Sequence, residues 1–237
     1  MLSDRPWRPE FVLFFGAAQV LCFGIGIFAA VLLHMAGVPG FKHENDFGNI
    51  LLATLSFQGA TWVLIPVLLR QHQIHWRDAF GLRKPGFLRA LAWATAALVV
   101  VLPAVLALNY MSEIALVKAG WEPKSQVAVE LLMGAPLWPT GIYIGFFAVV
   151  LAPVAEEFIF RGVLFPFVKQ LGWPKLAWIG VSVLFALIHG SAAIFLPLIV
   201  LALSLTWLYE KTGSLLAPIA VHSLFNAANL VIFWLNR

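Results

Sequence analysis

Charged residues are scarce in this sequence. They make up 11% of the chain, whereas 62% of the residues are hydrophobic; soluble domains carry about a quarter charged residues. This deficit of charge excludes an ordinary soluble protein and predicts a polytopic membrane protein. In such a protein Lys and Arg report orientation, so the net charge of +4 gives no indication of nucleic-acid binding. We expect membrane lipid as a partner, no nucleic acid, and one membrane domain over residues 1–237.

Several residue types and motifs used by known intramembrane enzymes are also missing. The single cysteine, Cys22, excludes an internal disulfide bond. No His-Glu-x-x-His is present, which argues against a zinc protease of that type. Gly190-Ser191 follows His189, but the Gly-x-Ser-x-Gly-like setting of a serine nucleophile is missing. A catalytic pair of aspartates inside the membrane is not indicated, because all three lie outside the apolar runs: Asp4, Asp46 and Asp78.

Long apolar runs make up most of the chain. A helix needs about 20 apolar residues to cross the hydrocarbon core of a bilayer. We therefore predict an all-α fold, a transmembrane helical bundle of about seven spans (six to eight), with a short interfacial helix over residues 125–133. The predicted spans are residues 11–35, 47–69, 88–110, 137–168, 175–189, 192–209 and 215–235.

The fourth run is too long for one straight span at about 1.5 Å per residue. Pro139, Pro153 and Pro166 lie inside it, and an interior proline removes a backbone hydrogen bond and clashes with the preceding turn. We predict a break or bend in this run. Pro153 is the most important of the three, because it precedes a group of charged residues by three positions.

The loops differ in their content of basic residues. Residues 70–87 hold four basic residues and one acid, Asp78, so the positive-inside rule places this loop in the cytoplasm. Alternation of the spans then places the N-terminus in the cytoplasm as well. The short chain with brief loops favours the plasma membrane of a prokaryotic cell.

Three charged residues interrupt the fourth run: Glu156, Glu157 and Arg161. A charged side chain near the bilayer centre costs about 2.5–3.5 kcal/mol on insertion scales, so such residues indicate function by default. Glu157 and Arg161 are four positions apart and share a helix face, which predicts an ion pair. Glu156 points about 100° away. It is therefore left free to act as a general base.

Two other predicted helices also carry polar residues at a spacing of four. Phe185 and His189 share a face of the fifth run, and His222 and Asn226 share a face of the seventh. Taken singly, each polar residue is explained by hydrogen bonding between helices. A free glutamate, two histidines and an asparagine on three helices together predict a catalytic site within residues 137–235.

Three motifs lie in order along residues 152–229: Glu156-Glu157-x-x-x-Arg161, Phe185-x-x-x-His189 and His222-x-x-x-Asn226. Their order and approximate spacing resemble the signature of the CAAX protease and bacteriocin-processing family of intramembrane endopeptidases, also called the Abi family, which includes the type II CAAX prenyl endopeptidases. The resemblance implies that Glu156 and His189 activate a water that attacks a peptide carbonyl. His222 and Asn226 would then stabilise the oxyanion.

The resemblance leaves the cofactor and the substrate open. Glutamate with two histidines is a common catalytic zinc set with a fourth position for water, so Glu156, His189 and His222 are candidate metal ligands; a metal-free glutamate mechanism is the other possibility. Implied substrates are prenylated protein tails, leader peptides, bacteriocins and membrane-anchored proteins. The loop sequence Phe80-Gly-Leu-Arg83 also resembles the family without indicating any chemistry. A proton-coupled transporter or a non-catalytic scaffold built on the same polar residues is the alternative function.

Overall fold

The computed structural model describes residues 7–43, 46–82, 86–121 and 141–235. Within these ranges all regular structure is helical, which confirms the all-α fold class. The first half contains α1 (Pro9–Met35), α2 (Phe47–Thr54), α3 (Ala60–Gln71), α4 (Trp76–Ala79) and α5 (Phe87–Lys118). The second half contains α7 (Ile142–Phe146), α8 (Ala152–Glu157), α9 (Phe165–Gln170), α10 (Pro174–Leu187), α11 (Ala192–Thr212) and α12 (Leu216–Leu235). The predicted interfacial helix at residues 125–133 lies outside the described residues.

Each of the seven predicted runs forms a helix where it is described. Five of these helices are long and apolar enough to cross a membrane: Pro9–Met35, Phe47–Gln71, Leu88–Lys118, Ile142–Gln170 and Ala192–Thr212. The other two predicted runs form shorter apolar helices, Pro174–Leu187 and Leu216–Ile232. The chain is thus an integral membrane protein, and five helices in its described part are long enough to span a bilayer.

Local sequence signals set several helix ends. Pro9 and Pro174 lie at the starts of α1 and α10, where the missing N–H of proline would have had no helical partner. Gly213 follows α11 with a φ of 67°. Only glycine adopts this left-handed conformation readily, so it ends the helix.

Of the break or bend predicted in the fourth run, the break is wrong, because residues 142–170 form one continuous helix. Two π-helical turns replace the break: η3 (Phe147–Leu151), just before Pro153, and η4 (Phe158–Leu164), just before Pro166. A proline lacks the N–H that an α-helix requires and crowds the carbonyl of the preceding turn. The wider π-helical turn accommodates that carbonyl and lets the helix continue. Pro139 lies outside the described residues.

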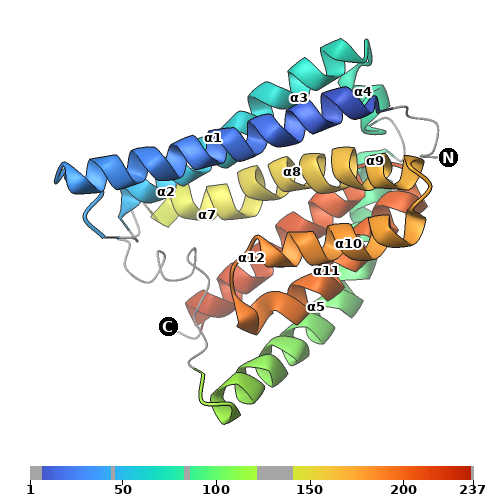
Figure 1. Cartoon of the computed structure of the whole chain (residues 1–237). Helices are drawn as coiled ribbons and strands as arrows, with labels where there is room; N and C mark the ends of the chain where they lie inside the picture. The colour runs from blue at the N-terminus through green and yellow to red at the C-terminus, as the bar shows by residue number, and fades with distance from the viewer. Residues whose placement is uncertain (1–6, 44–45, 83–85, 122–140, 236–237) are drawn as a thin grey trace.

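This long helix, which we name the central helix (Ile142–Gln170), lies between two groups of helices. Figure 1 shows α1 and α3 side by side along one side of it, and α10, α11 and α12 on the other, with α5 packed on α11 and α12. Burial follows this arrangement. In the most apolar window of each span, 44% of the central helix and 50% of α11 are buried, against 17–22% for the other three spans. Glu156, Glu157 and Arg161 of the central helix are therefore shielded by protein.

Candidate active site

The central helix and α12 bring four of the predicted polar residues into the protein interior. Glu156 and Glu157 belong to α8, Arg161 belongs to η4, and His222 lies on α12. All four are buried. His189 follows the end of α10 by two residues and joins the same group. We name these five residues the polar cluster.

Glu157 and Arg161 form the predicted ion pair. Arg161 Nη1 lies 3.0 Å from Glu157 Oε1, and both side chains are completely inaccessible to solvent. The other oxygen of Glu157, Oε2, is buried and has no hydrogen-bond partner among the described residues. Within that part of the chain, Arg161 therefore contacts the carboxylate through Oε1.

Three neighbouring residues complete the contacts of Arg161, and two of them, Ala202 and Thr206, were not singled out by the sequence. Its Nη2 donates to the carbonyl oxygen of Ala202 at 2.8 Å, and its Nε lies 3.4 Å from Thr206 Oγ1. The guanidinium carbon also lies 4.9 Å from the centre of the Phe185 ring. A threonine in an apolar helix most often bonds its own backbone, as Thr206 also does at 2.9 Å to Ala202 O. No sequence signal distinguishes it.

His222 is oriented by Glu157. The Nδ1 atom of His222 lies 3.0 Å from Glu157 Oε1, the same oxygen that Arg161 contacts. An ionised carboxylate only accepts hydrogen bonds, so Nδ1 carries the hydrogen. The second ring nitrogen, Nε2, is directed at Glu156, with 3.8 Å between it and Oε2.

His189 is oriented in the same way by a backbone group. Its Nδ1 lies 2.7 Å from the carbonyl oxygen of Phe185, which only accepts, so Nδ1 is again the donor. Its Nε2 lies 4.0 Å from Glu156 Oε2. The Phe185 ring packs against both imidazoles, with ring centres 4.7 Å from His189 and 5.6 Å from His222. The side chain of His189 is 23% exposed, against 4% for His222, so the cluster is most open on the His189 side.

Three acceptors therefore converge when both imidazoles are neutral: Glu156 Oε2 and the Nε2 atoms of His189 and His222. Their separations of 3.8 and 4.0 Å exceed the 2.7–3.2 Å of a direct hydrogen bond. Polar groups at such distances are commonly bridged by water. A water molecule can donate to two of the three acceptors, and the arrangement is therefore suited to holding and deprotonating one.

The same residues fit a metal in donor type but not in spacing. A metal-binding histidine usually bonds a carboxylate or carbonyl through its second nitrogen, as His189 and His222 both do. However, neighbouring ligands of a tetrahedral zinc are about 3.3 Å apart, as follows from bonds of about 2.0 Å. The gaps to Glu156 are wider. Across the described residues, no three His, Cys, Asp or Glu side chains form a group that can hold a metal ion.

Asn226 lies one turn after His222 and contacts the central helix instead of the rest of the cluster. Its Nδ2 donates to the carbonyl oxygen of Ala148 at 2.8 Å. In the π-helical pattern of η3, the N–H of Ala152 donates five residues back, to Phe147. The next donor in that pattern would be residue 153, which is proline and has no N–H. Asn226 thus supplies the hydrogen bond that Pro153 cannot give.

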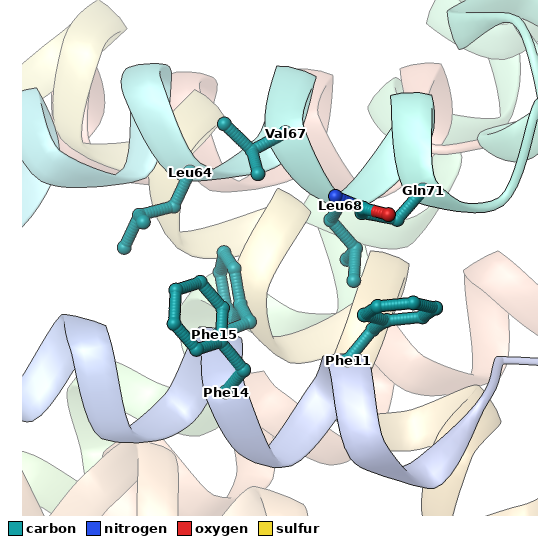
Figure 2. Close-up of a pocket in the computed structure, with 7 residues that line it drawn as sticks. All are labelled: Phe11, Phe14, Phe15, Leu64, Val67, Leu68 and Gln71. Atoms are coloured by element: carbon teal, nitrogen blue, oxygen red, sulfur yellow. The ribbon is translucent and has the colours of Figure 1, made fainter.

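A hollow of a different character lies between α1 and α3. Figure 2 shows its apolar lining, to which Gln71 adds one amide: Phe11, Phe14, Phe15, Leu64, Val67, Leu68 and Gln71. It contains no residue of the polar cluster and offers no acid, base or nucleophile.

Comparisons with known proteins match the part of the chain that carries the cluster. Residues 137–228 match the family model described as "Type II CAAX prenyl endopeptidase Rce1-like". A relative, "UPF0177 protein YxdF" of Lactococcus lactis subsp. lactis (strain IL1403), is 35% identical over 78 residues, which are 32% of this chain and 42% of that protein. The match thus spans less than half of the relative. No solved structure matches the chain. The matched segment contains all three motifs, so residues 137–228 are similar to the Rce1-like type II CAAX prenyl endopeptidases.

Proposed function

We propose that this chain is an intramembrane endopeptidase in which Glu156 is the general base. The observation that carries the proposal is the convergence of Glu156 Oε2 with two Nε2 atoms whose rings are each fixed through Nδ1. A water held there donates one proton to Glu156 and one hydrogen bond to His189. Its oxygen is then nucleophilic enough to attack a peptide carbonyl carbon.

The remaining steps use the same residues. In this mechanism His222 carries a hydrogen on both ring nitrogens from the start, and the water donates to Glu156 and His189 only. Attack gives a tetrahedral intermediate with a negative oxygen, which the Nε2–H of His222 stabilises while Glu157 accepts from Nδ1. Asn226 uses one amide hydrogen for Ala148. The second hydrogen remains for the oxyanion, because an amide group has two donors. Glu156 then passes its proton to the leaving nitrogen, the C–N bond breaks, and a carboxyl and an amine end are released.

We propose a peptide bond of a membrane-associated protein as the substrate, because the central helix, which carries Glu156, is long and apolar enough to cross a membrane. The family description supports a prenylated C-terminal tail, and a leader peptide is the other candidate. The proposal includes no metal-dependent step. Proton-coupled transport, the alternative, would use Glu156 as a proton carrier without cleavage.

We also propose a prokaryotic plasma-membrane location with the N-terminus in the cytoplasm. Contacts between residues far apart in the sequence support placing the N-terminus and the ends of the central helix and α11 on the same side of the membrane. The N–H of Trp7 donates to Gln170 Oε1 at 3.0 Å, and Lys169 pairs with Glu210. The start of α1 and the ends of the central helix and α11 therefore meet, and Figure 1 shows the end of α3 there too. Impermeant labelling of single cysteines introduced at this end from outside intact cells tests the orientation, and no labelling is expected.

The decisive experiment compares the purified chain in liposomes with its Glu156→Gln variant. The probes are a farnesylated CAAX peptide, the same peptide without the lipid, and a leader peptide, with products identified by mass spectrometry. Glu156→Gln keeps the size of the side chain and removes the base, so kcat should fall about 10²- to 10⁴-fold. Glu10→Gln makes the same change at an exposed position and serves as the control. Undiminished cleavage by Glu156→Gln contradicts the mechanism, and Glu156-dependent proton transport without cleavage supports the transporter.

A further inference from the structure

Phe80, in the connection between α4 and α5, lies against the helical turn that carries Arg161. Its ring is completely buried, and it packs edge-on against Phe158 with 4.6 Å between ring centres. Phe158 directly follows Glu157 and begins the π-helical turn η4. Phe80 therefore contacts the first residue of the segment that separates Glu157 from Arg161.

The same ring also touches the far end of that segment. A Cβ atom added to Gly162 would lie 2.8 Å from Phe80 Cε1 and 3.0 Å from Cδ1. Gly162 directly follows Arg161, and its lack of a side chain is what admits the ring. Phe80 thus spans the stretch from Phe158 to Gly162, the stretch whose shape sets the positions of Glu157 and Arg161.

The backbone holds Phe80 in place. The N–H of Leu215 donates to the carbonyl oxygen of Phe80 at 3.0 Å. Gly81 has a φ of 62°, and a Cβ added there would lie 1.9 Å from the carbonyl oxygen of Gly213. The backbone of the loop therefore packs directly against the turn between α11 and α12, and the position of Phe80 is fixed.

We infer that Phe80 is a positioning residue for the proteolytic site and acts by holding the π-helical turn between Glu157 and Arg161. A π-helical turn is rare and persists where its surroundings favour it. If the ring is removed, the turn relaxes, Glu157 shifts, and the His222 ring loses its fixed acceptor. The inference rests on the proposed function, and it makes catalysis depend on a residue outside the matched segment 137–228.

The test is a double-mutant cycle on the contact between Phe80 and Gly162, measured as kcat and KM on the cleaved peptide in liposomes. Gly162→Ala forces a methyl group into the Phe80 ring, and we expect kcat to fall at least tenfold with KM changed less than twofold. Phe80→Leu alone should lower kcat severalfold. The double variant should have a higher kcat than Gly162→Ala alone, because leucine leaves room for the methyl group. Gly145→Ala is the matched control on the same helix, since its Cβ would only meet Leu230 at an ordinary 3.6 Å.

Rescue in the double variant supports the inference, and losses that multiply without rescue overturn it. If Gly162→Ala does not fold, Phe80→Leu decides alone: an unchanged kcat overturns the inference. A second readout does not need proteolysis. In the Glu156→Gln background, Phe80→Leu should raise amide hydrogen exchange at residues 157–164 more than at residues 142–150, and a uniform rise overturns the inference. If Glu156→Gln retains full cleavage, the proposed mechanism fails, while this exchange experiment still tests the positioning role of Phe80.

Discussion

Asn226 on α12 makes up for the hydrogen-bond donor that Pro153 lacks on the central helix. The proline leaves the carbonyl of Ala148 without a helical partner, and Asn226 Nδ2 donates to that oxygen at 2.8 Å. The contact ties α12, which carries His222, to the helix that carries Glu156. A structural role for Asn226 thus stands beside the oxyanion role that we propose for it.

The structural role can be isolated by restoring the missing backbone donor. Asn226→Ala should lower the free energy of unfolding by about 1–3 kcal/mol, the usual result of leaving a buried polar group unpaired. Adding Pro153→Ala supplies an N–H at residue 153 and should recover part of that stability, measured by thermal unfolding in detergent. Loss of the second amide donor should still leave kcat about 10²- to 10³-fold low in the double variant. Recovery of kcat together with stability would leave Asn226 with the structural role only.

The lowered pKa of Asp46 predicts that the stability of the turn before α2, away from the polar cluster, depends on pH. Its pKa is lowered from 3.8 chiefly by the hydrogen bond from the backbone N–H of His43, with a second from Lys42; the two bonds measure 3.0 and 2.7 Å. A lowered pKa in the folded state means that Asp46 stabilises the turn before α2 above about pH 4. That contribution disappears as the pH falls through the folded pKa. Hydrogen exchange at residues 42 and 43 should thus be faster in Asp46→Ala than in the wild type at pH 6, and the difference should shrink as the pH falls below about 4.

The helices and the identity of the polar cluster were predictable from the sequence. Apolar runs and helical spacing are local properties, and the spacing of Glu157 and Arg161 indicated their pairing directly. The continuity of the central helix was not predictable, because proline can break a helix or be accommodated by a π-helical turn, and neighbouring helices decide between the two.

Residues that act through distant contacts were also missed. Thr206 and the carbonyl of Ala202 contact Arg161 across more than 40 positions of sequence. In the sequence Phe80 stands only in a loop motif, and its contact with Gly162 depends on how three segments pack. Such contacts leave no periodic pattern in any one segment, so periodicity cannot reveal them.

The spacing of the cluster predicts how the proposed cleavage activity responds to chelators. Because Glu156 Oε2 lies 3.8 and 4.0 Å from the two Nε2 atoms, we expect water rather than zinc between them. Cleavage by the purified chain should then survive dialysis against a strong chelator, with kcat changed less than twofold. Metal content should be measured by mass spectrometry on the same sample. Zinc bound one to one, with activity lost on its removal and restored on its return, would show that the cluster contracts around a metal.

Variants of the ion pair between Glu157 and Arg161 should separate its effect on stability from its effect on catalysis. Glu157→Gln leaves Arg161 charged, buried and without its partner, so the free energy of unfolding should fall by about 3–5 kcal/mol. Adding Arg161→Met removes the unpaired charge and should recover most of that loss. The double variant should nevertheless keep kcat at least tenfold low, because a neutral amide beside His222 Nδ1 does not stabilise the imidazolium that faces the oxyanion. Thr206→Val, which removes only the hydroxyl 3.4 Å from Arg161 Nε, is the control and should cost about 1 kcal/mol or less. Full recovery of kcat in the double variant would mean that Glu157 only neutralises Arg161. A kcat that stays low at restored stability would mean that Glu157 also orients His222 and stabilises its charge.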